Sequence, residues 1–360
     1  MDDISGIELS RRFHGEVVAP WLRRAFPGLH HAAALIGSGS ELMGFDDVLS
    51  RDHDWGSRVL LFVSEGDFAT HAVAVVDAFA AAAPAEFLGH PLRLNRTRGG
   101  DIEGVRHDPR HGLEVHTLEA MLRRTLALAL DEPRDALTWL GLSEQRLLTM
   151  TTGAVFHDDD GRLTAVRQRL SALPRDVRLY KLACQWRRIG EEQAFVGRTG
   201  DRGDDLGSRV IAARLVRDAM RMAFLIEDRY APYPKWFGAA FARLPCAPAL
   251  APLLERALAA TDWKVREAAL AETYRTLAAL QKARGLAGAA PVIGPFHERP
   301  FMVINADAIG AAIAAEIGDP ALRALPIIGS LDQVTDATPV IEAPDRSRRV
   351  MAALFDHREA

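Results

Sequence analysis

Two short apolar runs joined by a polar segment are the feature that most constrains the fold of this chain. The first, residues 32–36, ends at Gly37-Ser38, and the second, residues 59–63, follows Asp52 and Asp54. Runs of this length bounded by glycine and charged residues predict buried β-strands. Successive side chains in a strand point to opposite faces, so Asp52 and Asp54 would share one face. Paired carboxylates can bind a divalent cation, and a glycine-serine turn offers backbone N–H groups to phosphate.

The bulk composition describes a globular protein without a general basic charge. A chain of 360 residues is long for one hydrophobic core, so two domains are expected. The formal net charge of −4 argues against sequence-independent nucleic-acid binding. Cys184 and Cys246, the only cysteines, are too few for a disulfide framework or a zinc module. The N-terminus is acidic and no apolar stretch approaches ~20 residues, so we expect a cytoplasmic protein without a membrane anchor.

The order of the predicted elements indicates an α+β chain. Helical spacing over residues 7–26 and 67–83 flanks the two strands, and residues 112–118 alternate as a further strand. After residue 119 helical periodicity dominates. The candidate helices are 119–130, 143–152, 162–171, 175–190, 205–230, 248–258 and 262–283. We therefore expect a mixed-sheet domain over residues 1–140, and an all-helical domain over 141–360 whose tail folds back onto the core.

The opening motif does not match the common phosphate-binding loops. Its glycines lack the Gly-x-Gly-x-x-Gly spacing of a dinucleotide fold, and no Gly-Lys-Ser/Thr ending follows. What remains is a strand, a glycine-serine turn and an Asp-x-Asp pair. Together with Gly37-Ser38, three later blocks resemble the DUF4037 family, predicted nucleotidyltransferases of the polymerase-β-like superfamily: residues 50–56, 113–118 and 180–186.

This resemblance implies a nucleotidyltransferase-like mixed sheet followed by a helical domain. Asp52 and Asp54 would ligate a pair of Mg²⁺ ions, which stabilise the attacking and leaving oxygens of an in-line displacement at phosphorus. Gly37 and Ser38 would hold the β- and γ-phosphates of a nucleoside triphosphate. Glu114 would complete the carboxylate set, either as ligand to the second metal ion or as general base towards an acceptor hydroxyl.

Lys181 is the candidate cation of the helical domain. It lies on one face of a predicted helix, where polar side chains usually meet only solvent. A metal-triphosphate site between two domains needs positive charge from the second domain, and lysine suits phosphate as a flexible point charge. Lys181 is therefore a candidate nucleotide-binding residue.

Other polar and aromatic residues receive structural interpretations. The arginines at 214, 217 and 221 are expected to face solvent, opposite an apolar face of their helix. Residues 230–237 form an aromatic, proline-rich corner for which we favour core packing over stacking on a base. Asp46 and Asp47 are expected to be turn residues. A zinc site at His107 and His111 is disfavoured because Pro109 separates them.

The favoured function is transfer of a nucleoside monophosphate, AMP from ATP, to a hydroxyl of a small molecule bound between the two domains. The alternative is a nucleotide-binding regulatory protein with little or no catalysis, and the retained Asp52-x-Asp54 pair argues against it. A third possibility, an RNA or protein acceptor, is weakened by the balanced charge.

Overall fold

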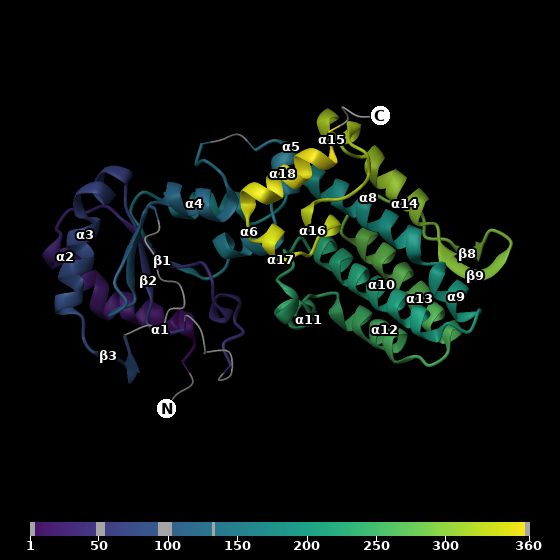
Figure 1. Ribbon diagram of the computed structural model, residues 1–360, viewed down its shortest axis with the longest axis horizontal. Helices are drawn as coiled ribbons and strands as arrows, with labels where there is room; N and C mark the ends of the chain where they lie inside the picture. Colours follow the sequence, from purple (N-terminus) through teal and green to yellow (C-terminus); the bar gives the residue numbers. More distant parts are fainter. Residues whose placement is uncertain (1–3, 48–54, 93–102, 132–133, 357–360) are drawn as a thin grey trace. The chain divides into compact units, whose positions relative to one another are not determined.

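The chain divides into two compact units in the computed structural model, which describes residues 4–47, 55–92, 103–131 and 134–356 (Figure 1). Unit 1 comprises residues 1–133 and 146–171, and unit 2 comprises residues 134–145 and 172–360. The sequence predicted one boundary after residue 140, whereas the chain passes between the units three times. Residues 146–171 belong to unit 1 because strand β7 (Ala154–Asp158) pairs with strand β1 (Ala32–Leu35).

A mixed sheet organises unit 1. In the described part of the chain its strand order is β5-β6-β2-β1-β7, with β2 at Val59–Phe62, β5 at Val105–His107 and β6 at Leu113–His116. Strands β2 and β6 are parallel, and the other neighbours are antiparallel. The α+β fold class, with a mixed sheet before a helical second half, is therefore confirmed. Strand β7 was not predicted, because its five residues lie between two segments of helical periodicity.

Helices pack the hydrophobic core of unit 1 against this sheet. The elements besides the sheet are α1 (Gly6–Phe13), η1 (His14–Val18), α2 (Ala19–Ala25), η2 (Ser40–Met43), α3 (Glu65–Ala82), the pair β3 (Glu86–Phe87) and β4 (His90–Pro91), α4 (Leu118–Leu126), α6 (Glu144–Thr151), which contains a unit boundary, and α7 (Arg162–Leu170). Phe13, Leu22 and Phe79 are buried against sheet residues such as Leu61 and Val115. Burying each large apolar side chain stabilises the unit by about 1.5–3 kcal/mol.

Short-range signals explain where these helices begin. The Ser64 hydroxyl accepts the backbone N–H of Asp67 (3.0 Å) at the start of α3, and Thr117 accepts that of Ala120 (3.2 Å) at the start of α4. Such N-caps satisfy helix N–H groups that have no partner within the helix. The predicted helix over 67–83 is confirmed, and it begins two residues earlier, at Glu65.

Unit 2 is built from helices around α8 (Arg175–Glu192), with one exception. Its other helices are α5 (Ala136–Gly141), α9 (Phe195–Gly200), α10 (Asp205–Ile226), α11 (Pro234–Ala242), α12 (Ala247–Ala259), α13 (Trp263–Ala283), α14 (Ala306–Ala315), α15 (Pro320–Ala324), α16 (Leu331–Val334), α17 (Thr338–Ile341) and α18 (Pro344–Leu354). Helix α8 packs against α10 and α14, and α10 packs against α13 (Figure 1). The exception is the hairpin of β8 (Ile293–Phe296) and β9 (Arg299–Ile304), which the prediction of an all-helical domain omitted.

A buried hydrogen bond fixes the position of helix α8 relative to helix α13 in unit 2. The indole N–H of Trp186 in α8 donates to Gln281 in α13 (2.8 Å), and both residues are buried.

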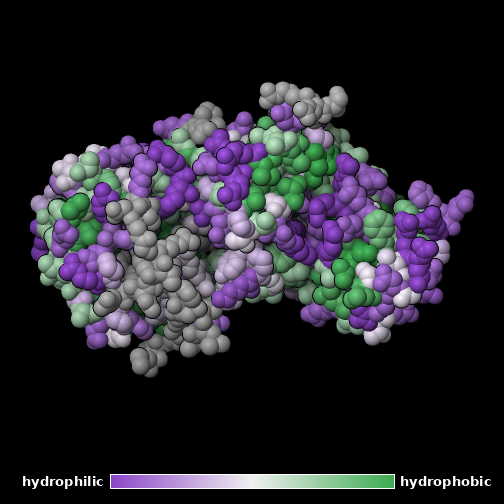
Figure 2. Space-filling view, in the orientation of Figure 1, coloured by the Kyte–Doolittle hydropathy of each residue, from purple (hydrophilic) through white to green (hydrophobic). Residues whose placement is uncertain are grey.

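On the face seen in Figure 2, a band of hydrophilic residues over α8 and α16 separates two hydrophobic areas of unit 2. Within the described residues, no helix combines the length and the apolar character needed to cross a membrane.

Candidate functional site

The glycine-serine turn directly follows strand β1 in unit 1. Gly37 has φ +115° and Gly39 has φ +141°, backbone conformations that favour glycine. A Cβ on Gly39 would lie 2.3 Å from a carboxylate oxygen of Glu41, so a side chain there would have to displace Glu41. A Cβ on Gly37 would meet nothing within 4 Å, and Ser38 is exposed. The side of the turn that a Gly37 side chain would occupy is therefore open.

A buried ion pair holds the turn in place. The guanidinium of Arg58, at the entrance to β2, pairs with the carboxylate of Glu41 and donates to the carbonyl of Ser38 (3.1 Å). Burial raises the pKa of Glu41, and the adjacent charge of Arg58 opposes that shift. The backbone N–H of Gly37 donates to Thr149 (3.0 Å). Contacts on both sides thus pre-organise the turn, which lowers the entropy cost of binding a ligand there.

Glu114 occupies the second position of strand β6 and is buried. One of its carboxylate oxygens accepts a hydrogen bond from Nε2 of His116 (2.9 Å), which fixes the side chain. In the parallel ladder Glu114 is opposite Leu60 of β2, and Leu60 is opposite Ala34 of β1. A carboxylate oxygen is a ligand that Mg²⁺ accepts, so this donor fits the predicted metal site.

The sheet topology brings two parts of the predicted site to one edge. Because β1 is antiparallel to β2 and β2 is parallel to β6, the end of β1 lies at the edge where β2 and β6 begin. Gly37-Ser38 leaves the sheet at that edge, and Glu114 lies one residue into β6 from it. Asp52 and Asp54 precede β2 in the sequence and lie outside the described residues, as does His53.

The neighbouring residue Asp46 lies in a segment without regular secondary structure after η2. It accepts the backbone N–H of Gly6 (2.7 Å) and lies 3.4 Å from the indole nitrogen of Trp55. These contacts join the segment after β1 to the start of α1. Asp46 therefore anchors the described residues that follow η2.

Lys181 lies inside unit 2, on helix α8, with only 2% of its surface exposed. Its ammonium group pairs with the carboxylate of Glu144, whose second oxygen accepts the backbone N–H of Ala231 (2.9 Å). Burial alone would raise the pKa of Glu144, but the charge of Lys181 brings the net shift below the ordinary value. Asp332 accepts the backbone N–H of Glu144 (3.0 Å), and burial beside the Glu144 charge raises the pKa of Asp332.

This pairing gives Lys181 a carboxylate partner within its own unit. A triphosphate contact would require the Lys181 ammonium group to exchange Glu144 for phosphate, so that role stays a prediction. The sequence drew attention to Lys181 only through the scarcity of lysine, and it did not identify Glu144 as the partner. The partner is 37 positions away, and no local pattern links the two.

The comparisons with known proteins bear on this helical part of the chain. Residues 139–237 match the family model described as "Domain of unknown function (DUF4037)". This segment of the chain is similar to that family. The predicted resemblance to DUF4037 is confirmed over this segment, which contains the block at residues 180–186. Gly37-Ser38 and the blocks at 50–56 and 113–118 lie outside the match. The curated proteins contain no match to the chain. A crystal structure of a nucleotidyltransferase-like protein from Exiguobacterium sibiricum 255-15 is similar at 11% identity and a TM-score of 0.34, with 76% of each chain covered.

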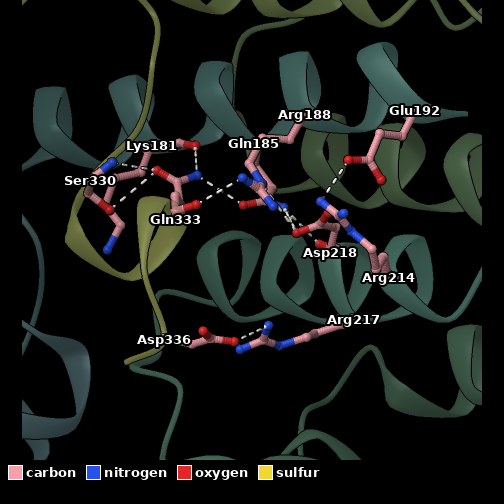
Figure 3. Close-up of polar contacts among 10 residues, drawn as sticks. All are labelled: Lys181, Gln185, Arg188, Glu192, Arg214, Arg217, Asp218, Ser330, Gln333 and Asp336. Atoms are coloured by element: carbon pink, nitrogen blue, oxygen red, sulfur yellow. Dashed lines mark hydrogen bonds and ion pairs between the residues drawn. The ribbon is translucent and has the colours of Figure 1, made fainter. Parts of the chain in front are cut away.

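A run of polar contacts follows helix α8, which lies within the matched segment (Figure 3). Gln333, in α16, donates to the backbone carbonyl of Lys181 and to Gln185, both at 2.9 Å. Gln185 in turn donates to Asp218 of α10 (2.9 Å), and Arg188 lies 3.4 Å from the same carboxylate. These contacts link α16 to α8 and α10, although α16 lies more than a hundred residues after α10 in the sequence.

Four arginines of α8 and α10 border a cavity of about 390 Å³ beside these contacts. The sequence predicted that the α10 arginines face solvent; Arg214 and Arg217 are exposed, yet they also line this cavity with Arg188 and Arg221. Arg217 pairs with Asp336 (2.9 Å), and Arg214 pairs with Glu192 (2.7 Å) (Figure 3). The helical spacing of the three α10 arginines was the sequence signal for this cavity.

A second cavity, of about 330 Å³, shares Arg217 and Arg221 with the first. It is lined by the predicted aromatic corner, including Tyr233 and Phe237. Phe237 also packs on Phe224 of α10, with ring centroids 5.4 Å apart. The corner thus supplies core packing, as favoured from the sequence, and an aromatic cavity wall as well.

Proposed function

We propose that this protein is a Mg²⁺-dependent nucleotidyltransferase that transfers AMP from ATP to a hydroxyl group of a small-molecule acceptor. The observation that carries the proposal is the placement of Gly37-Ser38 and Glu114 at one edge of the unit 1 sheet, with Asp52-x-Asp54 preceding β2 in the sequence. This order combines a phosphate-binding turn with a set of carboxylates, which is what nucleotidyl transfer requires.

Each residue has a chemical task in this proposal. The backbone N–H and the exposed hydroxyl of Ser38 bind the β- and γ-phosphates, and Gly37, whose own N–H donates to Thr149, holds the turn in shape. This contact orients the α-phosphorus for attack. Glu114, whose carboxylate is oriented by His116, accepts the proton of the acceptor hydroxyl or ligates a metal ion. Asp52 and Asp54 are the other metal ligands. Bound Mg²⁺ would neutralise the charge that develops on the phosphate oxygens.

The reaction balances without a further co-reactant. The acceptor oxygen forms a bond to the α-phosphorus, and the bond between that phosphorus and the bridging oxygen of the β-phosphate breaks. Pyrophosphate leaves with the bonding electrons, and the hydroxyl proton passes to the base. The products are an adenylylated acceptor and pyrophosphate.

Labelling of a cell extract with ATP radioactive at the α-phosphate tests the proposal. We expect the parent protein to transfer the label to a small molecule and to release pyrophosphate in the presence of Mg²⁺. Asp52→Asn and Asp54→Asn should each abolish both products, because the amide removes a charged metal ligand. Asp47→Asn is the matched control: Asp47 is an exposed carboxylate nearby in sequence, and the variant should keep the parent's activity.

Two results would overturn the assignment in different ways. Pyrophosphate release by both variants at the parental rate would mean that the Asp-x-Asp pair is not the metal site. Binding of Mg-ATP by the parent without any labelled product would favour the regulatory alternative.

A further inference from the structure

Two histidines and an aspartate gather at one end of the β1–β7 ladder in unit 1. His31 directly precedes β1, His157 lies in β7, and Asp159 directly follows β7. One potential ligand atom from each residue lies within 4.8 Å of the others. The antiparallel pairing of Ala32 with Asp158 explains this cluster, because it places His31 opposite Asp159. Alternation along the strands then puts His157 on the same face.

Hydrogen bonds fix the Asp159 carboxylate between the two histidines. One oxygen accepts the backbone N–H of His31 (2.9 Å), and the other accepts from Nε2 of His157 (2.8 Å). The backbone N–H of Asp159 returns a bond to the carbonyl of His31 (3.2 Å). The carboxylate is therefore oriented before any ligand arrives.

The His31 ring is oriented by a contact typical of metal-binding histidines. Its Nδ1 lies 3.0 Å from the backbone carbonyl of Leu29. A neutral imidazole that donates from Nδ1 carries its lone pair on Nε2, and such a bond commonly fixes the tautomer of a histidine ligand. The His31 side chain is 12% exposed, whereas those of His157 and Asp159 are 41% and 32% exposed. The cluster thus has a rigid inner side and an outer side that is open to solvent.

We propose that His31, His157 and Asp159 form a binding site for Zn²⁺ or a similar transition-metal ion. Two imidazole nitrogens with one carboxylate oxygen suit zinc, whereas Mg²⁺ prefers oxygen ligands alone. Three protein ligands leave the fourth tetrahedral position to water on the exposed side. Zinc ligands lie about 3.3 Å apart in a tetrahedral site, so the ion would replace the 2.8 Å hydrogen bond between His157 and Asp159.

The site would hold β7 onto the sheet. Its ligands come from the beginning of β1 and the end of β7, which are separated by more than a hundred residues in the sequence. Strand β7 lies at the edge of the sheet and pairs only with β1 among the described residues. A metal ion that bridges these two ends would add a second link between β7 and the sheet, besides its pairing with β1.

Equilibrium dialysis of tag-free, chelator-treated protein against Zn²⁺ tests this site. Excess Mg²⁺ in the buffer occupies oxygen-ligand sites such as the one proposed at Asp52 and Asp54. We expect one equivalent of Zn²⁺ per chain, and Co²⁺ in its place should show the visible absorption of a tetrahedral site. His157→Gln and Asp159→Asn should each weaken Zn²⁺ binding at least about tenfold.

His30→Gln is the matched control. His30 is adjacent to His31 in sequence, but its side chain is 73% exposed and lies near Asp160 (3.5 Å) instead. This variant should bind Zn²⁺ with the parent's affinity. The proposal is overturned if the parent binds no Zn²⁺, if His157→Gln and Asp159→Asn bind it as the parent does, or if His30→Gln loses as much affinity as they do. Circular dichroism of each metal-free variant verifies that it is folded.

Discussion

Lys181→Met should destabilise the protein strongly, because it leaves the carboxylate of Glu144 buried without its cation. The side chains of Lys181 and Glu144 are 2% and 7% exposed. Without Lys181, the backbone N–H of Ala231 would still donate to the Glu144 carboxylate, but it carries no charge. Methionine keeps an unbranched chain of similar size, so the main loss is the charge. Breaking a buried pair from one side costs about 3–5 kcal/mol in the free energy of unfolding.

Urea denaturation followed by tryptophan fluorescence measures this loss. Trp186 is fully buried on the same helix as Lys181 and reports on unit 2. With an m-value of about 3 kcal/mol per molar urea, the midpoint should fall by about 1–1.7 M. Lys282→Met, on the exposed end of α13, is the matched control and should stay within about 0.5 kcal/mol of the parent.

The effect should depend on pH with a defined sign. The folded-state pKa of Glu144 is lowered, so the stabilisation by its pair with Lys181 is fully present above the unfolded-state pKa of about 4.3. It is lost as the pH falls through the lower folded-state value. The difference between the parent and Lys181→Met should therefore be full at pH 7 and shrink in acid.

Two outcomes would refute this reasoning about Lys181. A free energy of unfolding within about 0.5 kcal/mol of the parent's would mean that the pair does not stabilise unit 2. The double variant Glu144→Gln/Lys181→Met should recover part of the loss, because no buried charge is left without a partner. If the loss of unfolding free energy in the double variant equals the sum of the losses in the two single variants, the effect comes from packing and not from the charge pair.

Nucleotide binding tests the other predicted role of Lys181. If folded Lys181→Met binds Mg-ATP with the parent's affinity, Lys181 does not belong to the nucleotide site.

Gly112→Ala and Glu114→Gln test the sheet and the chemistry of unit 1 separately. A Cβ on Gly112 would lie 1.9 Å from the backbone carbonyl oxygen of Ser57, so the variant should lose about 1–3 kcal/mol in urea denaturation. Gly66→Ala, whose Cβ would meet only one atom at 3.9 Å, should be as stable as the parent or more so; equal losses in both variants would contradict the steric reasoning. Glu114→Gln should lower pyrophosphate release by at least about a hundredfold while Mg-ATP still binds, and unchanged release would exclude a catalytic role for Glu114.

Much of the local structure could be predicted because its causes are local. The apolar runs that became β1 and β2, and the helical periodicity of α3, α8, α10 and α13, depend on neighbouring residues. The glycine at position 37 marked a turn, and the structure gives it φ +115°. Gly37-Ser38 and Glu114 could also be named as one set from the sequence, because the strands that carry them belong to a recognisable order.

Contacts between distant segments could not be predicted in the same way. Strand β7 is only five residues long, and its pairing with β1 depends on a free edge that the sequence does not display. The burial of Lys181 depends on Glu144 and Ala231, which approach it only after the helices of unit 2 have packed. A lysine on a polar helix face has the same local pattern whether it meets solvent, phosphate or a buried carboxylate.

The sequence by itself determined the α+β class and the positions of most helices, and it supplied the candidate residues for metal and phosphate. Backbone propensity, side-chain periodicity and the chemistry of carboxylates and glycine are properties of single residues and short segments. The tertiary structure decided which segments share a unit, which charges are buried in pairs, and where His31 meets His157 and Asp159. These outcomes depend on distance in space, and a linear pattern specifies distance only between near neighbours along the chain.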